Sequence, residues 1–267
     1  MISLTQILNE AINGPKAVIL AGAPGAGKGY ILRGLDLGEL KIMNVDDIYV
    51  PLLKKANVSL DLKNATPEER SEQAKQMAAA NKEFKGEMEK IIAGKESFIL
   101  DGTAASFNKT AQLKQELEEA GYDVFMLYVY TDLERSLKQN QDRFEKSGGE
   151  DRSLAPAIVM KTWMDVTKNY EPYKNLFDQN NFALVANTLE GEKLDSLEDI
   201  VSKYLTPFKP QGTKPKTDKQ KARSEERKSK EAEIIKSLLD DKFVDNIVND
   251  GLSKDEAQMR LKTFLTR

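Results

Sequence analysis

The stretch AGAPGAGKGY at residues 21–30, directly after the apolar run Ala17–Leu20, constrains the fold of this chain more than any other feature. Its core, Gly22–Lys28, fits the pattern GxxxxGK, in which a glycine-rich turn joins a strand to a helix and binds phosphate. Glycines let successive backbone N–H groups converge on phosphate oxygens, the following helix adds its positive end, and Lys28 adds a mobile charge. A tight turn without a ligand is the alternative, but strand, turn, lysine and helix together favour phosphate binding. We predict nucleotide contacts from Gly22, Ala23, Pro24, Gly25, Ala26, Gly27, Lys28, Gly29 and Tyr30.

The residues after Lys28 depart from the usual pattern, because Gly29 and Tyr30 stand where a magnesium-binding hydroxyl is expected. The sequence pattern Gly-x-Pro-Gly-x-Gly-Lys-Gly resembles that of adenylate kinase and other nucleoside monophosphate kinases, in which glycine also follows the lysine. In those enzymes threonine comes next, whereas this chain has Tyr30. We therefore expect Mg²⁺ to be held through water, nucleotide phosphates and carboxylates elsewhere in the chain.

The composition narrows the chemistry that this chain can perform. It contains neither cysteine nor histidine, which excludes disulfides, thiol nucleophiles, Ser-His triads and the usual zinc ligand sets. No apolar run approaches the roughly 18 residues that a membrane-spanning helix needs. We expect a mildly acidic cytoplasmic protein without a membrane partner, with a net charge of −3 over 267 residues.

Apolar runs alternate with helical patterns along the chain, which indicates a parallel sheet with helices on both faces. The sequence Thr66-Pro67-Glu68-Glu69 is a capping box with proline at the first helical position, and it predicts a helix over 67–93. Further helices are expected at about 108–120 and 132–146. The expected strands are 17–21, 41–45, 97–100, 124–130 and 182–186. The fold class is therefore α/β.

Two of the expected strands end in aspartates, and α/β sheets assemble ligand sites at the carboxyl ends of their strands. We predict that Asp101 binds Mg²⁺ directly or through water, with a helix-capping or turn aspartate as the alternative. Asp46 and Asp47 follow the second strand. We assign Asp46 to the acceptor hydroxyl, as a base or orienting group, because a chain without histidine needs a carboxylate there. Asp47 is then expected to cap the next helix, and the reversed assignment is the alternative.

Three segments together resemble the zeta-toxin-like branch of P-loop kinases, which includes bacteriophage-encoded members. They are NVDDIY at 44–49, FILDGT at 98–103 and YDVFMLYVYTDLERSLKQNQDR at 122–143. The resemblance covers about residues 15–190 and implies a P-loop NTPase fold, a three-layer αβα sandwich with a parallel five-stranded sheet of order 2-3-1-4-5. It also implies ATP as the phosphate donor and a hydroxyl or phosphate of a small molecule as the acceptor. Members differ in their acceptor, so its identity does not carry over.

Phosphoryl transfer depends on cations around the transferring group, and Arg143 and Arg152 are the candidates. They flank FEKSGGED at 144–151, a glycine-hinged stretch that is expected to act as a lid. The resemblance places a lid arginine here as well, and Arg135 is a further candidate. For each arginine, a solvated surface charge is the alternative. Asn187, directly after the last expected strand, matches a family position near the nucleotide base.

Composition changes after residue 205, where prolines and basic residues replace large apolar ones. We expect a kinase domain over 1–205, a flexible basic linker over 206–230 and a helical hairpin over 231–267. The hairpin carries a second capping box at Ser253-x-x-Glu256 and is the candidate docking site for a protein partner. The linker also contains acidic residues and has no aromatic residue beyond Phe208, so nucleic acid is not the expected partner.

The sequence thus predicts an ATP- and Mg²⁺-dependent kinase that acts on a small-molecule acceptor. The segment 49–66, with Leu52, Leu53 and Leu60, is expected to line the acceptor pocket. One alternative is a nucleoside monophosphate kinase or a polynucleotide 5′-kinase. Another is a catalytically weak nucleotide-binding protein that docks through its C-terminal hairpin, which Tyr30 and the sparse lid arginines favour.

Overall fold

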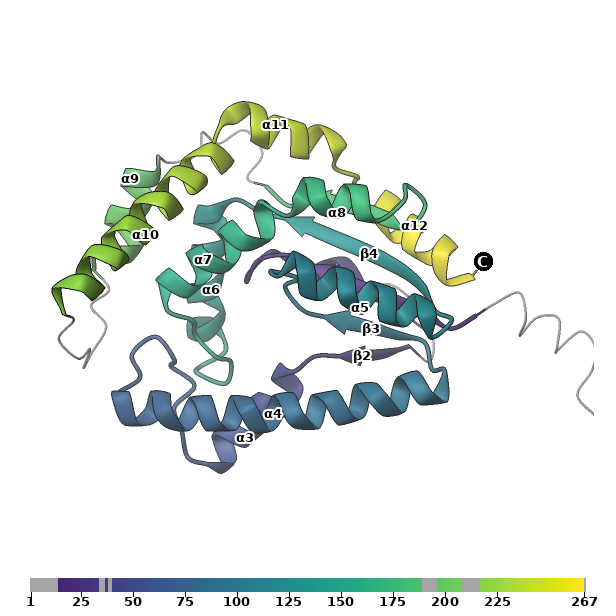
Figure 1. Ribbon diagram of the computed structural model, residues 1–267, viewed down its shortest axis with the longest axis horizontal. Coiled ribbons are helices and arrows are strands. Elements are labelled where there is room, and N and C mark those ends of the chain that lie inside the picture. The colour runs from purple at the N-terminus through teal and green to yellow at the C-terminus, as the bar shows by residue number, and fades with distance from the viewer. Residues whose placement is uncertain (1–13, 34–36, 38–39, 189–195, 208–216, 267) are drawn as a thin grey trace, which may run out of the picture.

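The computed structural model describes residues 14–33, 37, 40–188, 196–207 and 217–266. Its centre is a sheet of five parallel strands in the order β2-β3-β1-β4-β5 (Figure 1). The strands are β1 (Lys16–Ala21), β2 (Lys41–Met43), β3 (Phe98–Asp101), β4 (Asp123–Tyr130) and β5 (Phe182–Ala186). This sheet confirms the predicted α/β class, the five expected strands and the implied strand order.

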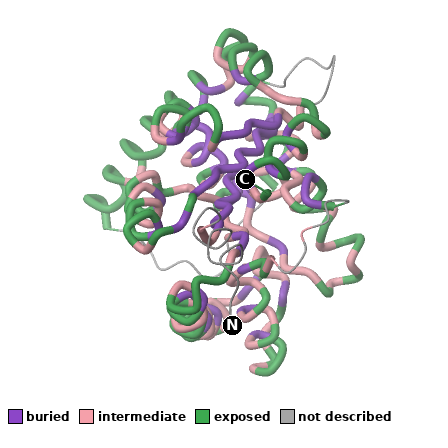
Figure 2. The backbone as a smooth tube through the Cα atoms, turned by 90° about the vertical axis from the view of Figure 1, so that its right-hand side faces the viewer, coloured by how far each residue is buried: buried purple, intermediate pink, exposed green. Residues whose placement is uncertain are grey.

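Helices cover both faces of the sheet, because alternate residues of each strand point to opposite sides. On one face, Ile19 and Met126 belong to a large apolar cluster that also holds residues of α4 (Pro67–Gly94), α5 (Phe107–Glu119), α7 (Pro156–Thr167) and α8 (Tyr170–Leu176). On the other face, Val18 and Phe125 pack with α2 (Lys28–Leu32) and α12 (Lys254–Thr266). Figure 2 shows the buried part of the chain in the interior, with exposed helical segments around it. The three-layer sandwich is therefore confirmed.

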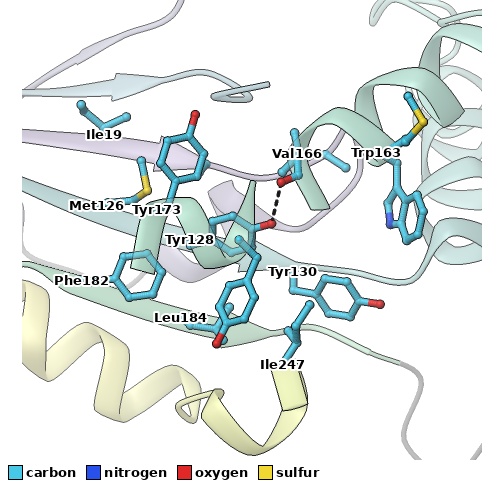
Figure 3. Packing of buried hydrophobic residues seen from close by; sticks show 14 of the residues in the cluster. Ile19, Met126, Tyr128, Tyr130, Trp163, Val166, Tyr173, Phe182, Leu184 and Ile247 are labelled. Atoms are coloured by element: carbon cyan, nitrogen blue, oxygen red, sulfur yellow. Dashed lines mark hydrogen bonds between the residues drawn. The ribbon is translucent and has the colours of Figure 1, made fainter. Parts of the chain in front are cut away.

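Aromatic side chains tie the first face to the carboxyl ends of the strands. The hydroxyl of Tyr128 donates to the carbonyl oxygen of Val166 at 3.0 Å (Figure 3). The indole nitrogen of Trp163 donates to the carbonyl oxygen of Thr131 at 2.7 Å, directly after β4. Each of these buried polar atoms therefore has a partner, and α7 is fixed beside the edge of the sheet where ligand sites form.

The expected helices appear close to their predicted limits. α4 begins with the capping box: Glu69 N donates to Thr66 Oγ1 at 3.2 Å, and Thr66 N donates to Glu69 Oε2 at 2.8 Å. It ends at Gly94, after which Lys95 adopts a φ of 55°. The other helices that the structure describes before residue 206 are α3 (Asp46–Lys55), α6 (Leu133–Lys146), α9 (Leu197–Ile200) and the π-helix η1 (Val201–Leu205).

The predicted linker differs from the structure, because its second half is helical. α10 (Asp218–Leu238) begins at a capping box formed by Thr217 and Gln220. Lysine, arginine, glutamate and alanine favour helices, and the pairs Lys230–Glu226 and Arg227–Glu231 add support at i,i+4 spacing. The segment therefore forms a helix although it lacks large apolar residues. Residues 208–216 of the predicted linker lie outside the described residues.

The C-terminal segment is also organised differently from a separate hairpin. After α10, the chain forms α11 (Asp241–Asp250) and α12, whose capping box at Ser253 and Glu256 is present as predicted. Leu261 and Phe264 of α12 are buried against the second face of the sheet, and the Phe264 and Phe125 rings lie 5.0 Å apart. These residues belong to the core on the second face of the sheet. None of the described helices combines the length and apolarity needed to cross a lipid bilayer.

Candidate active site

The phosphate loop lies between β1 and α2, as the sequence predicts, and two of its glycines have left-handed backbone angles. Gly25 has a φ of 76° and Gly27 a φ of 89°. A Cβ atom on Gly27 would lie 2.6 Å from Asn187 Nδ2, so a larger residue would displace the Asn187 amide. The loop therefore needs glycine at this position both for its backbone conformation and for space.

Side chains from other elements donate hydrogen bonds to the carbonyl oxygens of the loop. Asn187 Nδ2 donates to the carbonyl oxygen of Ala26 at 2.8 Å, and Ser136 Oγ donates to that of Pro24 at 2.7 Å. Gln139, with its amide assigned in the orientation that its neighbours require, donates to the carbonyl oxygen of Gly25 and accepts from Arg135 Nε. The sequence reasoning missed Ser136 and Gln139, and it placed Asn187 near the nucleotide base. In the structure, the Asn187 amide contacts the loop itself.

Lys28 lies at the start of α2, and its Nζ donates to the carbonyl oxygen of Gly22 at 3.1 Å. Burial lowers the pKa of Lys28, while the carboxylates of Asp101 and Asp46 act in the opposite direction and Arg143 acts in the same one. A cation that is costly to keep charged gains more from a bound anion than a solvated one does. Lys28 is therefore suited to bind phosphate.

Asn44 links the two aspartates and was not predicted. Its Nδ2 donates to Asp101 Oδ2 at 3.1 Å, and its Oδ1 accepts from the backbone N of Asp46 at 2.9 Å. Asn44 therefore holds the start of α3, the role expected of Asp47. Burial raises the pKa of Asp101, with Lys28 opposing the rise. The sequence signal was available, since Asn44 directly follows β2.

Asp46 forms an ion pair with Arg152. Its Oδ2 accepts from Arg152 Nη2 at 2.7 Å and from Nε at 3.2 Å, while its Oδ1 is buried without a hydrogen-bond partner among the described residues. Asp46 lines the same cleft as the phosphate loop, whereas Asp47 lines a separate cavity of about 420 Å³ beside β2. The structure thus brings Asp46 to the cleft of the loop, whereas Asp47 lines the other cavity and acts on Asp101 only electrostatically.

The expected lid is fastened at two points. Arg143 forms a two-fold contact with Asp151, from Nε to Oδ2 at 2.5 Å and from Nη2 to Oδ1 at 2.8 Å, and its side chain is 58% exposed. Ser153 Oγ donates to Asp61 Oδ1 at 2.7 Å, and Ser153 N donates to the carbonyl oxygen of Leu60 at 3.0 Å. The segment after the glycine pair is therefore bound to the loop between α3 and α4.

These residues surround one open cleft of about 1760 Å³. Beyond the phosphate loop, Asp46 and Asp101, its wall includes Leu154 and the 53% exposed Ile158, next to Arg152. The predicted acceptor wall over 49–66 is not on this cleft: Leu53 and Leu60 are buried in their own cluster, and Leu52 lines the separate cavity. The apolar residues of α3 pack in the interior. Their spacing in the sequence did not distinguish this packing role from a role in lining a pocket.

The oxygen ligands around the cleft suit a hard cation that is bound together with phosphate oxygens of a ligand. Within the described ranges there is no cluster of three or more acidic or other metal-ligating side chains. Asp101, with Asn44 beside it, nevertheless offers carboxylate oxygens next to Lys28. Mg²⁺ keeps several waters and binds through one or two carboxylates plus substrate phosphates, so these residues fit it.

A parallel sheet of order 2-3-1-4-5, with a glycine-rich phosphate loop after β1 and acids at the ends of β2 and β3, defines a P-loop NTPase fold. The family model for zeta toxin matches residues 3–187, and this chain belongs to the zeta toxin family. Family membership supports a kinase-type function.

Two solved structures of low identity are similar to this chain, and the first of them shows the same fold. The AvrRxo1-ORF1:AvrRxo1-ORF2 complex with sulphate ions is 16% identical, with 94% of this chain and 81% of that chain covered and a TM-score of 0.50. A structure from the PezAT toxin–antitoxin system of Streptococcus pneumoniae is 16% identical, with 83% of this chain and 87% of that chain covered and a TM-score of 0.44. No curated protein sequence matches this chain.

Proposed function

We propose that this chain is an ATP- and Mg²⁺-dependent kinase that transfers the γ-phosphate to a hydroxyl or phosphate of a small-molecule acceptor. The observation that carries this proposal is the meeting of three groups in one cleft. Lys28 from the phosphate loop, Asp46 from α3 and Asp101 from β3 interact electrostatically there, and Asp46 keeps one buried oxygen unpartnered. A phosphate site, a metal-binding acid and a proton acceptor are the parts that phosphoryl transfer needs.

On the donor side, the loop amides and Lys28 would hold the β- and γ-phosphates. Asp101, oriented by Asn44, would hold Mg²⁺ directly or through water. When bound, Mg²⁺ neutralises charge on the phosphate oxygens. Because the loop glycines are already in their left-handed conformations and braced by Asn187, the amides need no rearrangement to receive the ligand.

On the acceptor side, Arg152 fixes Asp46 through Oδ2, while Oδ1 is buried without a partner and would have to become accessible to receive the acceptor hydroxyl. In the transfer to a hydroxyl, the acceptor oxygen forms a bond to the γ-phosphorus while the bond from that phosphorus to the bridging oxygen breaks. The hydroxyl proton goes to Asp46, and ADP leaves with the electron pair of the broken bond. Arg143 lines the cleft and, once released from Asp151, would add a cation over the transferring group.

The alternatives differ in the acceptor or in the chemistry. A nucleoside monophosphate kinase or a polynucleotide 5′-kinase would use the same donor side. A catalytically weak binding protein would bind ATP without transfer. A protein partner at residues 231–267 stays a prediction, and it has less support because Leu261 and Phe264 face the sheet rather than solvent.

The test is a panel of nucleotides, nucleotide sugars and 5′-hydroxyl oligonucleotides incubated with γ-labelled ATP and Mg²⁺. With the acceptor that is labelled, we expect Asp46→Asn to slow transfer by about 100-fold or more while ATP still binds, because the amide cannot take the proton. Asp47→Asn, the adjacent acid that points to the other cavity, is the matched control and should retain the rate. Equal rates for all three proteins would make Asp46 structural. ATP binding without labelling of any acceptor would favour the binding protein.

A further inference from the structure

The C-terminal helix α12 lies beyond residue 187, where the family match ends, yet it begins close to the phosphate loop. Leu252 forms a parallel bridge with Val185, and its backbone N donates to the carbonyl oxygen of Leu184 at 2.8 Å. This bridge lies near the carboxyl end of β5, which is the edge where the sheet assembles its ligand site. The chain therefore returns to that edge just before α12 starts at Lys254.

α12 supports the helix that follows the phosphate loop. α2 has only five residues, and its Ile31 is buried in the same cluster as Ala257 and Leu261 of α12. Gln258 Nε2 donates to the carbonyl oxygen of Ile31 at 2.6 Å, so α12 also satisfies a carbonyl at the end of α2. The two helices consequently form one packed unit behind the loop.

The Tyr30 ring contacts two cations, one directly after α2 and one at the start of α12. The Nζ of Lys254 lies 4.2 Å from the centroid of the Tyr30 ring, and the guanidinium carbon of Arg33 lies 5.5 Å from it. Tyr30 is 52% exposed, and Tyr30 and Arg33 line the cleft together with Gly27 and Lys28. No carboxylate within the described ranges forms an ion pair with Lys254 or Arg33. We call Lys254, Tyr30 and Arg33 the cationic clasp.

We propose that the cationic clasp binds the ribose and α-phosphate of the donor nucleotide, an inference that rests on the proposed function. Asp46 and Asp101 line the cleft together with Lys28 and so mark where the γ-phosphate would lie. A phosphate chain that starts there and follows the loop ends beyond Lys28, on the side of Tyr30. An anionic α-phosphate between Lys254 and Arg33 offsets the repulsion of two like charges, and the ring offers the ribose an apolar face. Tyr30 replaces the usual hydroxyl because this position serves the nucleoside end of the ligand.

The experiment compares the affinities of ATP and inorganic tripolyphosphate, both with Mg²⁺, by calorimetry on the full chain. Tripolyphosphate carries the phosphates without the nucleoside, so it reports on the loop alone. We expect Lys254→Met to weaken ATP binding by roughly five- to tenfold, as loss of a half-exposed charged contact does, and to leave tripolyphosphate binding unchanged. Lys254→Arg should restore ATP affinity. Lys262→Met, an exposed lysine farther along α12, is the matched control and should change neither affinity.

Each other outcome overturns the inference in a distinct way. Equal weakening of both ligands by Lys254→Met would mean that Lys254 only supports the fold of the loop. Unchanged ATP affinity would mean that the clasp does not touch the nucleotide, while the proposed kinase function would stand. If the unsubstituted protein bound neither ligand, the proposed function itself would fail and this inference with it. Thermal unfolding of each variant separates these results from a loss of folded protein.

Discussion

The donor side of the cleft, the phosphate loop Gly22–Lys28 with its supports, is held by neutral side chains that donate to its main-chain carbonyls, whereas the acceptor side is held by an ion pair between two side chains. Ser136 is fully buried and, like Asn187, donates directly to a loop carbonyl. On the acceptor side, Asp46 and Arg152 are separated by 106 positions in the chain, and their side chains remain 22% and 21% exposed.

The contrast has an energetic basis. Hydrogen bonds from buried neutral groups to main-chain carbonyls are costly to leave unmade, which fixes the loop before any ligand arrives. A partly exposed ion pair contributes less, because water and salt compete with it. We therefore expect a preformed donor side and an acceptor side that is easier to disturb. Substitutions on the two sides should separate ATP binding from transfer.

The largest effect is expected for Lys28→Met on the donor side. The methionine keeps much of the side-chain volume and removes the charge that faces the phosphates, so transfer should fall by about 10²- to 10³-fold, as when a preorganised electrostatic contact is removed. ATP affinity measured by calorimetry should fall as well. Lys90→Met, an exposed lysine on α4, is the control. A Lys28→Met protein that binds and turns over ATP normally would remove the loop from the mechanism.

Gly27→Ala should damage the same side through the backbone instead of the charge. Gly27 has a φ of 89°, and an added Cβ would meet Asn187 Nδ2 at 2.6 Å. We expect the free energy of unfolding to fall by about 1–3 kcal/mol, the usual cost of such strain, and ATP binding to weaken by roughly tenfold. Gly29→Ala is the matched control, since nothing lies within 4 Å of its added Cβ. Chemical denaturation and calorimetry measure the two effects, and equal behaviour of the two variants would contradict a preformed loop.

The donor side was also the more predictable one. The run Ala17–Leu20 and the glycine pattern that follows it are adjacent in the sequence, so the strand, the turn and the phosphate loop could be predicted from local sequence. Asp101 could likewise be placed at the end of a strand. The supporting residues Ser136 and Gln139 could not be predicted from the sequence, because their partners lie in the loop more than 100 positions earlier. Nothing in their local sequence distinguishes them from other polar residues on a helix.

The acceptor side and the C-terminus show why distance along the chain limits prediction. The choice of Asp46 over Asp47 depended on the direction of each side chain at the start of α3, and only the packed structure separates them into two cavities. The contact between Asp61 and Ser153 joins two loops with no shared pattern. Likewise, the apolar spacing of α12 indicated a helix but not the surface that it covers.

Ser153→Ala should disturb the acceptor side alone. The substitution removes the hydrogen bond to Asp61 that holds the lid segment beside Arg152, so Arg152 should position Asp46 less well. We expect a roughly three- to tenfold loss in kcat/KM for the acceptor, the scale of one buried hydrogen bond, with ATP affinity unchanged. Ser71→Ala, an exposed serine on α4, is the control. Steady-state kinetics with each substrate varied in turn test this prediction. An equal loss in ATP affinity would mean that the two sides are not independent.

The smallest effect is expected in stability, for Asp101→Asn without nucleotide and in EDTA. Burial raises the pKa of Asp101 above its ordinary value of 3.8, so the folded state holds the proton more tightly than the unfolded state does. Deprotonation then disfavours folding, and the cost appears as pH rises from the ordinary value through the raised one. The asparagine variant should therefore have a slightly larger free energy of unfolding than the unsubstituted protein at pH 7, and the difference should shrink as the pH falls toward 3.8. Denaturant titrations across that range test the sign. A difference that grows in acid would mean that the Asp101 charge favours folding, and the idea of an acid held ready for a metal at some cost in stability would be wrong.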